Sequence, residues 1–121
     1  MIRQYLNKRK QAFGYAFKGI YSMFMTEAHA KIHLLATICV ITCGIIFKIE
    51  RWEWCAVLIC IGGVLMAEAI NTAIEKIADA ITKERHPLIG AAKDIAAGAV
   101  LLLVIAAIAT GLIIFIPHMI K

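Results

Sequence analysis

A row of polar side chains continues directly from an apolar stretch long enough to be buried in lipid. The row consists of Glu68, Asn71, Glu75 and Asp79. An α-helix turns roughly 100° per residue, so these positions fall within an arc of about 80° on one helical face. Ionisable residues within membrane spans are costly to bury and are by default candidates for function. The stripe therefore predicts chemistry where a helix leaves the bilayer.

The residue types indicate phosphoryl transfer. Glu27 and Glu75, on separate segments, offer the hard oxygen ligands that Mg²⁺ prefers, and magnesium is commonly held by one or two carboxylates together with substrate phosphates. Glu68, at the lipid boundary, is placed to act as general base towards a hydroxyl that arrives from the membrane. Lys93 could neutralise charge on a transferring phosphoryl group, while Asn71 orients phosphate or substrate oxygens.

The usual nucleotide-binding loops of soluble enzymes are missing from the sequence. It contains no GxxxxGK[ST], no GxGxxG, no HRD and no DFG. Any ATP site must therefore be assembled from separate segments of the chain.

The overall composition is that of an integral membrane protein. The 121 residues are 62% hydrophobic, with a mean hydropathy of +0.83, which exceeds what soluble domains carry. This length leaves room for about three spans of ~20 residues and no second module. We therefore predict an all-α fold with a single membrane-embedded domain over residues 1–121.

Three apolar runs and one amphipathic segment define the expected helices. The runs cover residues 32–47, 54–67 and 95–116, without the alternation of outer-membrane barrel strands. With their neighbours they predict three transmembrane helices, over about 29–48, 53–81 and 92–117. Before them, an apolar stripe predicts an N-terminal amphipathic surface helix over about 5–28, formed by Phe13, Phe17, Ile20, Tyr21 and Phe24. A cytoplasmic helix packed on the rest of the protein is the alternative.

Basic residues set the expected orientation. Ten of the 13 lysines and arginines lie in the N-terminal segment or in the 76–93 loop, and three lie at the opposite ends of the spans. The positive-inside rule then places the N terminus and that loop in the cytoplasm, where Glu27, Lys93 and Asp94 join the acidic stripe. Topology and attraction to anionic lipid account for the net charge of +5, so nucleic acid is not an expected partner.

Cysteines and histidines give weaker signals. The four cysteines form no CxxC pair, lie within or beside the spans, and are interpreted as packing residues. His29 and His33 are spaced to share a metal with Glu27, but HxxxH alone is a weak pattern, and an interfacial histidine pair is the preferred interpretation. His118 has no recognisable partner.

The octet EAINTAIE at 68–75, followed by Asp79, HPL at 86–88 and AKDIAAGAVLL at 92–102, resembles the small prokaryotic diacylglycerol kinase and undecaprenol kinase family. FGYAFKGI at 13–20 and TEAHAKIH at 26–33 match the family's surface helix and its entry into the first span. The likeness covers nearly the whole chain. It implies a homotrimer of three-span subunits in the bacterial inner membrane, with active sites between subunits and phosphoryl transfer from MgATP to a lipid hydroxyl.

The resemblance also assigns roles to individual residues. Glu68 looks like the catalytic base, and Glu27 and Glu75 look like the metal carboxylates. The other matching positions belong to the family's polar core or its nucleotide contacts: Lys8, Tyr15, Asn71, Glu84, Arg85, His86, Lys93 and Asp94. Lys8 stands where the family has an arginine, and Arg85 stands where a tyrosine is common. Lysine does not replace arginine at a bidentate site, so the Lys8 contact differs from the family's.

The sequence leaves alternatives for the lipid acceptor and for the class of function. Ala16 and Ala97 replace hydroxyl-bearing residues of the diacylglycerol-specific enzymes, which favours undecaprenol, with diacylglycerol as the alternative. A small oligomeric ion channel or transporter would use the acidic stripe as an ion path, although the acids gather at one end of the spans. A structural or membrane-remodelling protein would not need Glu68.

Overall fold

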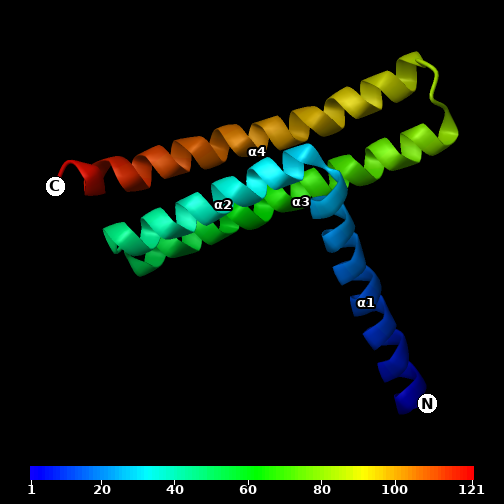
Figure 1. Ribbon diagram of the computed structural model, residues 1–121, viewed down its shortest axis with the longest axis horizontal. Coiled ribbons are helices and arrows are strands. Elements are labelled where there is room, and N and C mark those ends of the chain that lie inside the picture. The colour runs from blue at the N-terminus through cyan, green and yellow to red at the C-terminus, as the bar shows by residue number, and fades with distance from the viewer.

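The computed structural model describes residues 1–121 and contains four helices and no strand (Figure 1). The helices are α1 (Ile2–Thr26), α2 (Ala28–Phe47), α3 (Arg51–Ile81) and α4 (Pro87–Met119). Of 102 backbone hydrogen bonds, 93 lie within the helices, so most backbone polar groups are satisfied inside their own segment, as hydrocarbon requires. The prediction of an all-α fold is confirmed.

Three of the helices, α2, α3 and α4, are long and apolar enough to cross a membrane, which confirms the three predicted spans. At 31 and 33 residues, α3 and α4 exceed the length that the bilayer core requires. Helix α4 begins at Pro87, five residues before the predicted span of about 92–117. Proline suits the first helical position, and His86 Nδ1 accepts a 3.2 Å hydrogen bond from the Leu88 N–H, so this end forms ahead of the apolar run.

The turn between α2 and α3 is tight. Lys48 adopts a left-handed conformation, with φ 51° and ψ 54°, and the Ile49 N–H donates to the Gly44 carbonyl at 3.2 Å. This pattern stops a helix and reverses the chain. A Cβ on Gly44 would lie 2.7 Å from the Trp54 ring, so only glycine lets the two helices approach this closely. Ile49, Val57 and Ile114 form the small buried core beside the turn.

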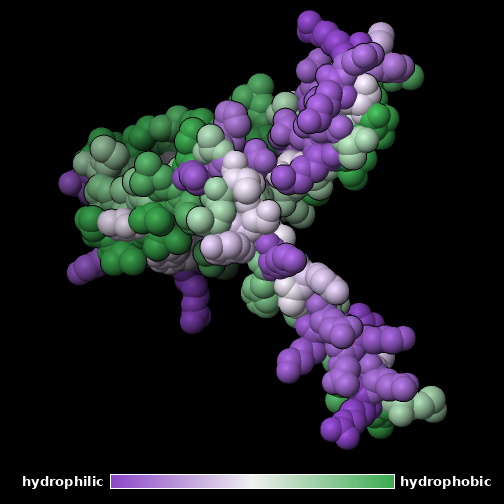
Figure 2. All heavy atoms as spheres, turned by 45° about the vertical axis from the view of Figure 1, so that its right-hand side comes forward, coloured by the Kyte–Doolittle hydropathy of each residue, from purple (hydrophilic) through white to green (hydrophobic).

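The three apolar helices lie side by side, whereas α1 leaves them at a steep angle (Figure 1). Helices α3 and α4 form the most extensive contact, and α2 packs mainly on α3. Figure 2 shows hydrophobic side chains over the packed helices, with hydrophilic ones gathered on α1 and at the end where α3 leads into α4. The surface therefore has an apolar body with polar groups at one side, as a membrane protein needs.

The break between α1 and α2 consists of one residue, Glu27. Its backbone is extended, with φ −106° and ψ 121°, and α1 ends at Thr26. Glu27 lies near the end of the range of about 5–28 that was predicted for the surface helix. Phe13, Phe17 and Tyr21 on α1 are exposed, as residues of a membrane-facing stripe would be in an isolated chain. The position of α1 in the membrane interface stays a prediction.

Candidate active site

The polar stripe on α3 passes from buried to exposed along the helix. Glu68 and Asn71 are buried, at 4% and 9% exposure, Glu75 is half-buried, and the Asp79 side chain is 55% exposed. The helical spacing puts these residues on one face, and the neighbouring helices cover only the part of that face nearest the apolar segment. The side chains of this stripe, which all carry oxygen atoms, therefore run from the buried part of the molecule to its exposed surface.

Glu68 meets a histidine from another helix. His33 Nε2, on α2, lies 3.6 Å from Oε2 of Glu68, and the two side chains are 18% and 5% exposed. This separation is too long for a hydrogen bond but lies within the range of an ion pair, which the two groups form only when the imidazole is protonated. The interpretation of His29 and His33 as an interfacial histidine pair did not include this contact with Glu68. Sequence reasoning had no signal for this contact, because it depends on how α2 rotates against α3.

Two buried polar atoms next to Glu68 have no hydrogen-bond partner. They are Oδ1 of Asn71 and Oγ1 of Thr72, and both residues lie within one helical turn of Glu68. Buried polar atoms nearly always have a hydrogen-bond partner. Two such atoms without a partner, close to a buried carboxylate, therefore mark a place where a ligand or water would bond. Asn71 was predicted to orient substrate oxygens. Thr72 was not predicted, because threonine in a helix usually bonds to its own backbone.

The loop after α3 forms a polar cavity with the first turns of α4. The cavity has a volume of about 300 Å³ and is lined by Lys83, Glu84, Arg85, His86, Ile89, Gly90, Lys93 and Asp94. Thr82 Oγ1 accepts a 3.0 Å hydrogen bond from the Glu84 N–H and so shapes the loop. Five residues that the sequence singled out, Glu84, Arg85, His86, Lys93 and Asp94, are brought together here. Lysine and arginine side chains in one cavity suit a phosphorylated ligand.

One cation of this cavity is already paired. Lys93 donates a 2.7 Å hydrogen bond to Oδ1 of Asp79, which lies at the exposed end of the α3 stripe. The contact joins the stripe to the cavity, so both features belong to one continuous polar surface. Figure 2 shows hydrophilic side chains gathered over this end of the molecule.

Other predicted site residues are not assembled within one chain. Lys8 and Tyr15 are exposed on α1 and do not line this polar cavity. Glu27 and Glu75 are both half-buried, and no group of three or more histidine, cysteine, aspartate or glutamate side chains gathers as a metal site. Lys8 and Tyr15 therefore lie outside the polar cavity, and the magnesium and nucleotide site stays a prediction.

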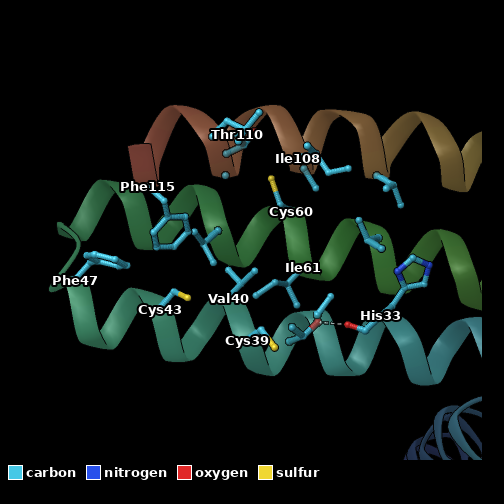
Figure 3. Close-up of a pocket in the computed structure, with 18 of the residues that line it drawn as sticks. His33, Cys39, Val40, Cys43, Phe47, Cys60, Ile61, Ile108, Thr110 and Phe115 are labelled. Carbon is cyan, nitrogen blue, oxygen red and sulfur yellow. Dashed lines mark hydrogen bonds between the residues drawn. The ribbon is translucent and has the colours of Figure 1, made fainter. Parts of the chain in front are cut away.

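An apolar cavity of about 540 Å³ opens between α2, α3 and α4, and 15 of its 19 lining residues are hydrophobic (Figure 3). Phe47 and Phe115 lie at one end, with ring centroids 6.2 Å apart, and the His33 imidazole points from α2 into the other end. Thr37 and Thr110 also line it, but their hydroxyls donate to carbonyls of their own helices at 2.8 Å. The cavity is thus hydrocarbon-like with a polar end at His33, the residue in contact with Glu68.

Sequences of known proteins match most of the chain. The family model described as prokaryotic diacylglycerol kinase matches residues 14–115. Undecaprenol kinase of Bacillus subtilis is 38% identical over 117 residues, which cover 97% of this chain and 95% of that protein. Diacylglycerol kinase of a Synechocystis species is 33% identical over 111 residues, covering 91% of this chain and 63% of that protein. Diacylglycerol kinase of Escherichia coli is 29% identical over 108 residues, covering 89% and 88%.

Proposed function

The chain belongs to the prokaryotic diacylglycerol kinase family and is an ATP-dependent lipid kinase, and we propose that its acceptor is undecaprenol. The observation that carries this proposal is the position of Glu68. A buried carboxylate contacts His33, and His33 lines one end of an apolar cavity. A lipid alcohol has the complementary form, a long hydrocarbon chain with one hydroxyl.

The preference for undecaprenol rests on similarity and on two residues. The chain is 38% identical to an undecaprenol kinase and 33% and 29% identical to two diacylglycerol kinases. Ala16 and Ala97 leave the chain without the hydroxyls that the resemblance associates with a glycerolipid headgroup. A polyprenol hydroxyl has no neighbouring ester oxygens to recognise, so it needs fewer polar partners. Diacylglycerol is the alternative acceptor.

In the proposed reaction, the acceptor hydroxyl loses its proton to the Glu68 carboxylate while its oxygen bonds to the γ-phosphorus of ATP. The bond from that phosphorus to the β–γ bridging oxygen breaks, and ADP leaves with the electron pair. Asn71 Oδ1, unpaired beside Glu68, orients the reacting groups. The cavity of Arg85, His86 and Lys93 binds the phosphates and neutralises their charge.

We propose that Glu27 and Glu75 hold Mg²⁺. The donor types fit, because magnesium prefers carboxylate oxygens, and both side chains are half-buried and so remain accessible to phosphate oxygens and water. When bound, the ion neutralises negative charge on the triphosphate. Glu75 and Glu68 lie on the same stripe, so one face of α3 would carry both a metal ligand and the base.

We further propose a homotrimer in the bacterial inner membrane, with the N terminus and the 76–93 loop in the cytoplasm. The basic residues favour this orientation. No residue of α1 lines either cavity, which favours a site that a neighbouring subunit completes with Lys8 and Tyr15. Hybrid oligomers test the shared site. Mixing Glu68→Gln and Glu27→Gln subunits should restore part of the activity if these residues serve one site from different subunits, and no recovery contradicts that arrangement.

The acceptor is tested by incubating the purified protein with γ-labelled ATP and undecaprenol, diacylglycerol or ceramide, followed by separation of the lipids. Undecaprenol should be labelled fastest. Faster labelling of diacylglycerol would reverse the acceptor assignment. The same protein in liposomes should conduct no ions without nucleotide, whereas a channel would.

A further inference from the structure

His33 has no role in the reaction described so far, yet it is the ionisable side chain in contact with Glu68. The two side chains approach from different helices, with His33 Nε2 3.6 Å from Glu68 Oε2. Both are largely shielded, at 18% and 5% exposure. A carboxylate that is removed from water needs a hydrogen-bonding or charged partner, and His33 is the group that lies within ionic reach.

The surroundings of His33 make simple packing an insufficient explanation. Its imidazole lies at the end of the apolar cavity, and the side chain makes no hydrogen bond of its own. Thr37 Oγ1 donates to the His33 carbonyl at 2.8 Å, which uses the backbone oxygen and leaves the ring nitrogens free. Figure 3 shows the ring directed from α2 towards α3, which carries Glu68. The polar imidazole of His33 therefore lies in apolar surroundings and is directed towards Glu68.

We propose that His33 is a positioning residue for Glu68, an inference that rests on the proposed lipid kinase function. Nε2 of His33 faces Oε2 at 3.6 Å, and an N–H on that nitrogen would attract and restrain the carboxylate, so that the other carboxylate oxygen, Oε1, is presented to the acceptor hydroxyl. The proton of that hydroxyl goes to Glu68 and not to His33, because His33 acts only through the orientation of the carboxylate. Misplacement of a reacting group by about 1 Å can cost roughly 100-fold in rate, so such a restraint has a measurable effect.

Two substitutions separate positioning from packing. His33→Gln keeps an N–H donor near the place of Nε2, whereas His33→Phe keeps the ring shape and removes the donor. His29→Gln is the matched control, because His29 lies one helical turn earlier on α2 and is exposed. The variants are assayed with the lipid acceptor that the wild type phosphorylates, and kcat and the KM for ATP are measured.

A positioning role predicts a kcat about 10- to 100-fold lower in His33→Phe, with His33→Gln retaining at least several-fold more and the KM for ATP changed less than about threefold in both. His29→Gln should match the wild type. A kcat for His33→Phe equal to or above that of His33→Gln overturns the proposal, since packing alone would favour the ring. An equal loss in His29→Gln overturns it as well.

The contact has a readout that does not depend on activity. In nanodiscs, the imidazole ¹⁵N signals of His33 should move in Glu68→Gln, while those of His118 stay in place. Glu53→Gln provides the reverse control, because Glu53 Oε2 lies 2.8 Å from His118 Nε2. Unchanged His33 signals in Glu68→Gln overturn the contact. If the wild type phosphorylates no lipid alcohol, the proposed function fails, and the NMR experiment still decides whether His33 and Glu68 interact.

Discussion

Lys93 Nζ lies 2.7 Å from Oδ1 of Asp79, so an ammonium group of the polar cavity is held by the exposed end of the α3 stripe. The Lys93 and Asp79 side chains are 37% and 55% exposed. Exposed ion pairs contribute little to stability because solvent screens them, so the ammonium can exchange Asp79 for a phosphate at little cost. The pair thus holds Lys93 at the cavity without preventing its use.

The first prediction separates the two members of this pair. Lys93→Met should lower kcat by about 10²- to 10³-fold, because a cation that stabilises the transferring phosphoryl group is lost. Asp79→Asn should lower it less than about tenfold, since the exposed pair itself contributes little. Steady-state kinetics with saturating acceptor measure both. Equal losses in the two variants would contradict a direct role of Lys93 on phosphate.

The second prediction concerns magnesium. Glu75→Gln removes one of two proposed carboxylate ligands, so the Mg²⁺ concentration for half-maximal activity should rise by about tenfold or more. Titration of activity with Mg²⁺ at fixed ATP measures the change. Asp79→Asn, on the same stripe but outside the proposed metal site, is the matched control and should keep the wild-type Mg²⁺ requirement. A Glu75→Gln curve that overlays the wild type would remove Glu75 from the metal site.

The third prediction addresses the tight turn between α2 and α3. Gly44→Val places side-chain atoms where the Trp54 ring already lies, since even a Cβ would be 2.7 Å from it. Overpacking of this kind costs about 1–3 kcal/mol, so the melting temperature in detergent should fall. Gly62→Val is the control, because no atom lies within 4 Å of a Cβ at Gly62. Equal melting temperatures for the two variants would contradict the close approach.

The fourth prediction concerns the contact between the first turn of α3 and the last turn of α4. Glu53 is buried, at 7% exposure, and its carboxylate lies 2.8 Å from the His118 ring. His118→Ala leaves that carboxylate without its partner and should lower stability by about 1–3 kcal/mol. Thermal unfolding monitored by circular dichroism measures the loss. Activity per folded protein should be retained, and a large loss of kcat with unchanged stability would argue against a structural contact.

Much of the fold followed from short-range patterns. Apolar runs and their lengths predicted three helical spans, and the roughly 100° turn per residue placed Glu68 and Asn71 on the same face. The loop residues from Glu84 to His86 were expected at the nucleotide site with Lys93 because of the family resemblance, and the structure brings them together in one cavity. The spans and the shared face depend only on composition or on residues that are close in sequence, so they can be predicted from the sequence.

The sequence did not indicate which side chains of different helices contact one another. His118 had no recognisable partner in the sequence, yet it contacts Glu53, 65 residues away, and His33 contacts Glu68, which no sequence pattern indicated. Sequence spacing shows which residues share a face, but the rotation and shift of one helix against another depend on side-chain packing.

The most direct test of the account is the kcat of Glu68→Gln, measured with saturating ATP and lipid alcohol. The matched control is Glu53→Gln, which changes another buried glutamate of the same helix. We predict that kcat falls by about 10²- to 10⁴-fold in Glu68→Gln, with the KM for ATP nearly unchanged, because a general base is lost while the nucleotide cavity stays intact. Glu53→Gln should keep the wild-type kcat per folded protein. Full turnover by Glu68→Gln would contradict the assignment of Glu68 as the base.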